Sequence, residues 1–259
     1  MVYVPFADLG RDTAGIGEGA PTRFVMNPGN VIGQDASHLC SPADAELLSV
    51  SVHRDVVEPF RDLHAAAANE GFDVSILSGF RSFEKQLSIW NRKARGELAV
   101  LDSNARPLDI TTLRPRELTF AILRWSALPG ASRHHWGTDI DVFDATAQPS
   151  GYEIELIPGE YENGGFFAPF SEWLDARIAN GTSFGFFRPY DRDRNGVAPE
   201  RWHLSYAPVS TTYARELSPD LLRQTIQSAD IMLKDVVLCL EEARGAAIPA
   251  PVRRILASL

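Results

Sequence analysis

Ser132-Arg133-His134-His135-Trp136-Gly137-Thr138-Asp139-Ile140-Asp141 is the stretch that decides the fold, and Glu200-Arg201-Trp202-His203 follows it about sixty residues later. Two imidazoles, a carboxylate and a further glutamate are the groups that a catalytic metal site needs. Such a site has three protein ligands, an open position for water, and a base that takes the proton of that water. We therefore interpret the two segments first as the site of a metallopeptidase.

The predicted strand Ile140-Asp141-Val142-Phe143 carries its carboxylate among apolar residues. A buried carboxylate is costly unless it is paired, so a cation is its natural partner, and a structural salt bridge is the alternative. Strand periodicity does not choose between the neighbouring histidines. His135 lies an even number of residues from Asp141, whereas a bulge at Gly137 would return His134 to the same face.

Length and composition limit the class of protein. With 259 residues, 44% hydrophobic and 23% charged, the chain can bury a full core. The net charge of −9 argues against a nucleic-acid partner, because such proteins usually carry a basic patch, and favours a neutral or peptide substrate. No run approaches the roughly 18 apolar residues of a membrane span. Cys40 and Cys239 have no metal-ligand spacing, and we expect free or buried thiols, with a single disulfide between them as the alternative.

Hydrophobic spacing and turn residues predict both helices and strands. We expect an irregular arm without core elements over residues 1–40. Pro59 is expected to kink or split the first helix. Helices are expected within residues 41–71, 83–96, 115–125, 170–178 and 218–243. Strands are expected at residues 72–77, 140–143, 184–187 and 202–206.

The metal motif resembles that of the zinc D,D-peptidases related to VanY and VanX, in the larger group that also holds lysostaphin-type endopeptidases and the hedgehog signalling domain. The family signature is Ser-x-His-x-x-Gly-x-Ala-x-Asp followed by Glu-x-Trp-His. The residues that match it are Ser132, His134, Gly137, Asp141, Glu200, Trp202 and His203. The resemblance covers roughly residues 41–208.

What the resemblance implies is one Zn²⁺ ion held by His134, Asp141 and His203. Glu200 would be the general base that activates the water and later protonates the leaving amine, and it would not be a ligand. An open fourth coordination position suits this division of labour, because it lets the metal lower the pKa of a water.

An upstream segment, Ser78-Gly79-Phe80-Arg81-Ser82, resembles the Gly-Phe/Tyr-Arg-Ser element of the same family. By that likeness, Arg81 would steady the tetrahedral oxyanion or the substrate carboxylate. Gln86 and Ser132 would contact the substrate backbone or its terminal carboxylate. Without the resemblance, an ion pair with Glu84 would be the simpler interpretation of Arg81.

One residue departs from the family pattern, because Asp139 stands where the family usually has alanine. It lies two residues before Asp141 and therefore on the same face of a regular strand. Three roles remain open for it: accepting a hydrogen bond from a ligand histidine, binding a cationic group of the substrate, or facing solvent. We favour the first.

The expected fold is α+β, with a small antiparallel sheet as the floor of the zinc cleft and helices packed on one side, as in the hedgehog and D,D-peptidase domains. The expected division is an arm over residues 1–40, a zinc peptidase domain over 41–209, and a helical extension over 210–259 that packs on the same domain. We expect a monomer.

The activity that the resemblance implies is release of the C-terminal D-alanine from a peptidoglycan stem peptide or its precursor. A peptidoglycan endopeptidase of the same family is the first alternative, and a non-catalytic zinc module is the second. The N-terminal segment lacks the pattern of a secretory signal. We therefore expect a periplasmic or cell-envelope location if a leader has been removed, and a cytoplasmic one otherwise.

Overall fold

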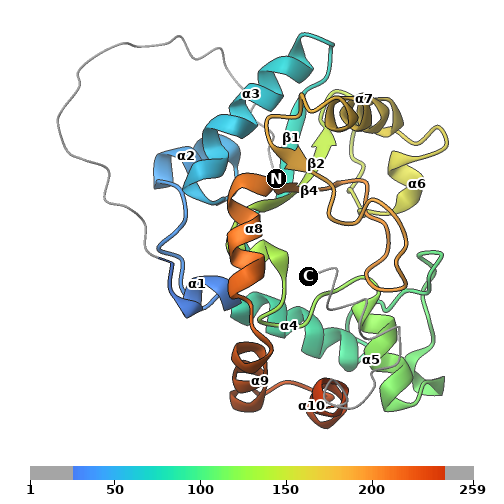
Figure 1. Cartoon of the computed structure of the whole chain (residues 1–259). Coiled ribbons are helices and arrows are strands. Elements are labelled where there is room, and N and C mark those ends of the chain that lie inside the picture. The colour runs from blue at the N-terminus through green and yellow to red at the C-terminus, as the bar shows by residue number, and fades with distance from the viewer. Residues whose placement is uncertain (1–25, 243–259) are drawn as a thin grey trace.

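A four-stranded antiparallel sheet forms the framework of the protein (Figure 1). The structure, a computed structural model, describes residues 26–242. The order of strands across the sheet is β1-β2-β4-β3. The strands are β1 (Val74–Ser78), β2 (Asp139–Asp144), β3 (Phe186–Phe187) and β4 (His203–Tyr206). Together with the helices described below, this sheet confirms the expected α+β class.

The two faces of β2 meet different surroundings. Ile140 and Val142 are buried in a hydrophobic core that the sheet shares with α3 (Val57–Ala68) and α7 (Ala168–Ala179). Asp141 lies between them in sequence and points to the other face, because successive side chains alternate across a strand. The sheet therefore has a hydrophobic core on one face and the polar residues of the candidate site on the other.

A second group of helices has a hydrophobic core separate from that of the sheet and occupies the lower half of Figure 1. It consists of α4 (Phe83–Ala94), α5 (Pro115–Leu123), α9 (Pro219–Ser228) and α10 (Lys234–Glu242). The prediction of a single helix over residues 218–243 is wrong for the described residues of this segment. The helical backbone is interrupted between α9 and α10, where Leu233 has a left-handed φ of 61°.

The first described residues include a helix, so the expectation of no core element in the arm is wrong there. The helix α1 (Pro28–Ile32) opens with a proline. Val31 is buried, and its carbonyl accepts a hydrogen bond from the indole nitrogen of Trp136 at 3.0 Å. The arm thus packs against the segment that carries the metal motif. Residues 1–25 of the predicted arm lie outside the described residues.

The helix expected over residues 41–71 is divided, but not by Pro59. The first part is α2 (Pro42–Leu48), and α3 begins at Val57. Pro59 lies in the first turn of α3, where a backbone N–H has no partner within the helix to lose. The division falls instead at Ser49, whose φ of 61° ends α2.

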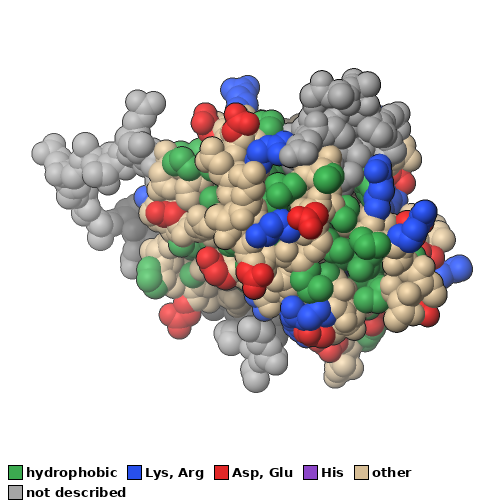
Figure 2. Space-filling model, turned by 90° about the horizontal axis from the view of Figure 1, so that it is seen from below, with side chains coloured by type: hydrophobic (Ala, Val, Ile, Leu, Met, Phe, Trp, Pro, Cys, Tyr) green, Lys and Arg blue, Asp and Glu red, His purple; other side chains and the backbone are tan. Residues whose placement is uncertain are grey.

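The remaining helical elements are short and connect these layers. They are α6 (Pro158–Tyr161), α8 (Ala207–Glu216) and the 3₁₀ turns η1 (Arg54–Val56), η2 (Ile110–Thr112) and η3 (Arg133–Trp136). Within residues 26–242, no helix has the length and apolar character needed to cross a bilayer. The expectation of free thiols is confirmed for Cys40 and Cys239. On the face shown in Figure 2, acidic, basic and hydrophobic side chains are interspersed.

Gly137 makes the turn from η3 into β2, and its φ is 64°. A Cβ at this position would lie 2.7 Å from the backbone nitrogen of His53. We expect Gly137→Ala to lower the free energy of unfolding by about 1–3 kcal/mol, measured by chemical denaturation. Gly151→Ala is the matched control, since Gly151 has a φ of 76° and nothing within 4 Å of the added Cβ. Equal losses in the two variants would show that the close contact with His53 has no cost.

Candidate active site

His134 reaches the candidate site from η3, and its Nε2 lies 3.4 Å from Oδ2 of Asp141. Its Nδ1 donates a hydrogen bond to the carbonyl of Gly79 at 2.9 Å, because a carbonyl oxygen only accepts. A neutral imidazole then keeps its lone pair on Nε2, the form in which histidine binds a metal. Gly79 is needed for this approach, since a Cβ there would lie 2.5 Å from the carbonyl oxygen of Ser51.

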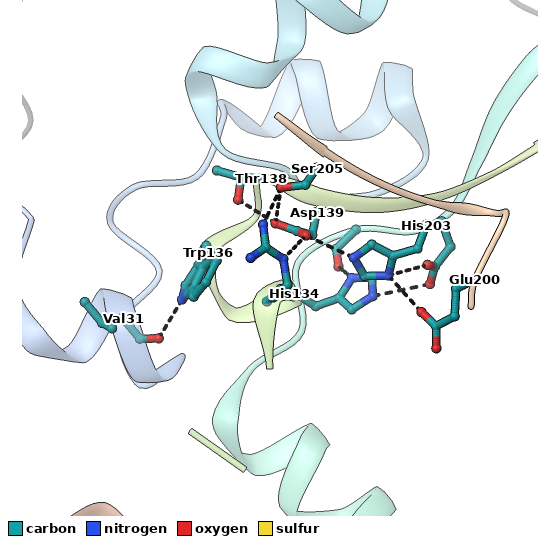
Figure 3. Close-up of polar contacts among 11 residues, drawn as sticks. Val31, His134, Trp136, Thr138, Asp139, Glu200, His203 and Ser205 are labelled. Atoms are coloured by element: carbon teal, nitrogen blue, oxygen red, sulfur yellow. Dashed lines mark hydrogen bonds and ion pairs between the residues drawn. The ribbon is translucent and has the colours of Figure 1, made fainter. Parts of the chain in front are cut away.

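His203 lies on β4, directly opposite Asp141 in the antiparallel pair of strands. Its Nδ1 is 3.3 Å from Oδ1 of Asp141, and its Nε2 is 3.0 Å from Oδ1 of Asp139 (Figure 3). With the Nε2 proton held by Asp139, the lone pair on Nδ1 faces Asp141. His134, Asp141 and His203 each offer an atom within 4.8 Å of the others. The structure thus brings together the three ligands that the family resemblance implies.

The chemistry of this cluster fits a divalent cation. Asp141 is buried, and its Oδ1 has no hydrogen bond within the described part of the chain. Burial lowers the pKa of His203, but hydrogen bonds to Asp139, Asp141 and Glu200 outweigh it and hold that pKa well above its ordinary value. The carboxylates therefore draw positive charge to this position. Two imidazoles and one carboxylate are also a three-ligand set of the catalytic kind.

Glu200 lies beside the cluster, in the turn that leads into β4. Its Oε2 is 3.3 Å from Nδ1 of His203, and its backbone N–H donates to the carbonyl of Tyr190 at 3.0 Å. The next residue, Arg201, anchors the turn by donating from Nε to the hydroxyl of Ser171 at 2.9 Å. Burial raises the pKa of Glu200. A carboxylate with a raised pKa is suited to accepting and returning a proton.

Arg81 is held in place by two hydrogen bonds. Its guanidinium donates to Oε1 of Gln86 at 3.1 Å and to the hydroxyl of Ser78 at 3.2 Å. Gln86 is fully buried behind it, and its amide donates to the carbonyl of Ala127 at 2.7 Å. Among the described residues, no ion pair joins Arg81 to Glu84, which is exposed. The structure thus places Arg81 at the site, while Gln86 is outside the lining of the cavity described below.

His135 is excluded from the cluster by its own hydrogen bonds. Its Nδ1 donates to the carbonyl of Arg81 at 2.6 Å, and its Nε2 accepts from the backbone N–H of Gly130 at 3.0 Å. Burial lowers its pKa to about 4, so the ring stays neutral. Strand periodicity left open which of the two histidines faces Asp141. In the structure it is His134, while His135 bonds to the backbone of Arg81 and Gly130.

Asp139 forms part of a buried polar network behind His203 (Figure 3). Besides His203, its carboxylate accepts hydrogen bonds from Nε of Arg133 at 2.7 Å, Oγ1 of Thr138 at 2.8 Å and Oγ of Ser205 at 3.1 Å. The side chain is fully buried and does not line the cavity. Of its three candidate roles, only the contact with a ligand histidine agrees with this placement.

Asp139→Asn is expected to weaken the binding of a divalent ion about 10- to 100-fold, because His203 loses the carboxylate that orients it. Affinity is measured with Co²⁺ in competition with a chelator, and thermal unfolding is followed separately. Ser205→Ala is the control, since it removes a neighbouring hydrogen bond and leaves the contact between Asp139 and His203 in place. Equal affinities in the two variants would contradict the orienting role.

A cavity of about 240 Å³ opens onto the cluster. Besides Arg81, five residues to which the sequence analysis gave a role line it: Ser132, His134, Asp141, Glu200 and His203. The structure adds others to which the sequence analysis gave no role: Lys93, Trp125, Glu155 and Tyr190. A signal existed only for Lys93, which follows Gln86 by two helical turns on one face of α4. Glu155 and Tyr190 lie in loops, where spacing carries no such signal, and Trp125 lies just beyond the end of α5 at Leu123, although the sequence predicted a helix as far as residue 125.

Fold and site define a class of α+β protein in which an antiparallel sheet presents a His-Asp-His cluster, a buried glutamate and an arginine to one cavity. The sequence model of the family described as VanY, D-alanyl-D-alanine carboxypeptidase, matches residues 49–209, which is more than half of the chain. The chain belongs to the VanY D-alanyl-D-alanine carboxypeptidase family.

Two individual relatives and one solved structure share between 21% and 35% sequence identity with this chain. An uncharacterized protein of Haemophilus influenzae is 35% identical over 113 residues, which are 43% of this chain and 84% of the relative. A D-alanyl-D-alanine carboxypeptidase of Enterococcus faecalis is 28% identical over 171 residues, 64% of this chain and 53% of the relative, so the match spans about half of that protein. A solved structure of VanYB in complex with D-alanine-D-alanine has 21% identity and a TM-score of 0.47, covering 76% of this chain and 92% of that one.

Proposed function

We propose that this protein is a zinc-dependent D,D-carboxypeptidase that removes the C-terminal D-alanine from a peptidoglycan stem peptide or its precursor. The observation that carries the proposal is the convergence of His134, Asp141 and His203, within 4.8 Å of one another, beside Glu200. Membership of the VanY family supports the peptidase class.

His134 through Nε2, His203 through Nδ1 and the Asp141 carboxylate are the groups that would hold the zinc ion. Bound there, Zn²⁺ supplies Lewis acidity, which polarises a carbonyl and makes a water more acidic. Glu200 takes one proton from the attacking water, whose oxygen forms the new bond to the scissile carbonyl carbon. Glu200 then gives this proton to the amide nitrogen of the leaving D-alanine as the C–N bond breaks.

Arg81 compensates the negative charge that develops on the carbonyl oxygen. Its hydrogen bonds to Gln86 and Ser78 orient the guanidinium before the substrate binds, so little reorganisation is needed during the reaction. Ser132 lines the same cavity and is available to the substrate backbone. In this scheme Gln86 acts through Arg81 and does not touch the substrate.

The test is metal analysis of the purified protein combined with mass spectrometry of tetrapeptide and pentapeptide stems after incubation. Loss of one terminal D-alanine from the pentapeptide, abolished by a chelator and restored by Zn²⁺, is the expected result. Two internal fragments would instead identify an endopeptidase. Bound zinc with every peptide intact would favour the non-catalytic module and refute the proposal.

A further inference from the structure

The segment 188–202, which connects β3 to β4, is held near both of its ends by one face of α7. Arg188 follows β3 directly, and its guanidinium donates to Oδ1 of Asp175 at 2.6 Å and to Oγ of Ser171 at 3.2 Å. Arg201 lies near the other end, and it donates to Oδ2 of Asp175 and to the same Ser171 hydroxyl. Because Ser171 and Asp175 are four residues apart, they share one face of the helix. One carboxylate thus joins the two ends of the segment.

Asp175 supplies the counter-charge that lets the two guanidiniums lie close together. Each of its oxygens accepts a hydrogen bond from a different arginine. The Arg188 side chain is only 5% exposed. Its pKa is lowered to about 10, first by burial and also by the charge of Arg201, while Asp175 opposes both effects. Without the carboxylate, a buried cation would face a second cation uncompensated, which is a costly arrangement.

The helix α7 is a firm support for these contacts. Ser171 is fully buried, and Phe170 and Leu174 are buried in the core that α7 shares with the sheet. Asp175 itself lies outside the cavity and outside the His-Asp-His cluster. Its effect on the candidate site therefore passes through the arginines that it holds.

Arg201 connects Asp175 to Glu200. Adjacent residues are joined by a planar peptide unit with their Cα atoms about 3.8 Å apart, so a shift of Arg201 also moves the backbone of Glu200. Oε2 of Glu200 lies 3.3 Å from Nδ1 of His203 (Figure 3). His203, by contrast, is fixed by the pairing of β4 with β2 and by Asp139. Loss of the Asp175 contacts would therefore displace Glu200 and leave His203 in place.

We propose that Asp175 is a positioning residue, which holds Glu200 at the hydrolytic site by binding Arg188 and Arg201 together. The inference rests on the proposed function, since it takes Glu200 as the general base, and it deepens that function by naming what fixes the base. A displacement of about 1 Å in a reacting group can lower a rate about 100-fold. The Asp175 contacts should therefore affect kcat, and affect KM and metal binding little.

The test begins with Asp175→Asn, which removes the charge and keeps the shape of the side chain. We expect kcat for release of D-alanine from a stem pentapeptide to fall about 10- to 100-fold, with KM and the affinity for Zn²⁺ close to those of the parent. Hydrogen exchange measures the same loosening without catalysis. The Glu200 amide should exchange about 10-fold faster, because the turn opens more readily once a charge-assisted hydrogen bond is lost. Glu172→Gln is the matched control, since Glu172 is an exposed carboxylate on α7 and should change neither quantity.

Two further variants separate positioning from a general loss of stability. Asp175→Glu keeps the charge and should retain most of kcat. Arg201→Met should lower kcat as Asp175→Asn does, and the double variant should lose little more, because Asp175 acts through Arg201. Fully additive losses in the double variant would contradict this route.

Unchanged exchange at the Glu200 amide of Asp175→Asn protein would overturn the inference, and so would faster exchange with a parental kcat. Loss of zinc from this variant would equally count against it, because the metal ligands would then have moved as well. Failure of the proposed function has a different signature, since the zinc-loaded parent protein would leave stem pentapeptides intact. Even in that case, the exchange measurement decides whether Asp175 fixes Glu200.

Discussion

Replacing Glu200 by glutamine is expected to lower kcat/KM for release of D-alanine by about 10²- to 10⁴-fold, the usual contribution of a general acid-base. Glutamine keeps the size of the side chain but cannot take the proton of the attacking water. Because Glu200 lies outside the ligand set His134, Asp141 and His203, the variant should still bind the metal ion.

The decisive measurement is metal content and hydrolysis on the same sample. Glu84→Gln is the matched control, since Glu84 is exposed in the first turn of α4 and is not part of the cavity. It should behave as the parent does. A Glu200→Gln protein that retains zinc and cleaves stem peptides at the parental rate would falsify the role of Glu200.

The sequence predicted the strands of the site because their local signals were strong. Ile140 and Val142 alternate with aspartates, and this pattern alone places Asp141 on the face opposite the core. Periodicity could not separate His134 from His135, because both lie in a 3₁₀ turn ahead of the strand. The hydrogen bonds of His135 to Arg81 and Gly130 separate them, and they join segments far apart in sequence.

The predictions for Pro59 and for the N-terminal arm were wrong for different physical reasons. Pro59 was expected to kink or split a helix, but it lies in the first turn of α3, where a proline costs no hydrogen bond within the helix. The helix α1 is too short to show a period, and the contact of Val31 with Trp136 helps to hold it. In α1 a contact between distant segments therefore adds what the local pattern lacks.

Asp139 shows what a departure from a family pattern can mean. The sequence indicated only that a carboxylate replaces alanine two residues before Asp141. Its partner Arg133 is adjacent to His134 in sequence, and His203 comes from another strand. A carboxylate could be buried here because Arg133 neutralises it within the same network. The burial of Asp139 therefore depends on its contact with Arg133, a residue to which the sequence analysis gave no role.

Arg81→Met is expected to lower kcat by about 10²- to 10³-fold, the usual cost of removing a group that stabilises an oxyanion. The charge that Arg81 compensates develops only in the transition state, so kcat should fall while KM changes little. Steady-state kinetics on a stem pentapeptide provide the measurement, with circular dichroism to verify the fold. A loss confined to KM would assign Arg81 to the ground-state carboxylate instead.

Gln86→Met tests whether Arg81 must be oriented as well as present. This variant removes the hydrogen bond to the guanidinium but keeps the charge, and we expect a fall in kcat of about 10-fold. Steady-state kinetics on the same stem pentapeptide provide the measurement. A kcat equal to that of the parent would show that the charge of Arg81 is enough without the hydrogen bond to Gln86. The fall is expected because the hydrogen bonds of Arg81 to Gln86 and Ser78 are what fix its guanidinium.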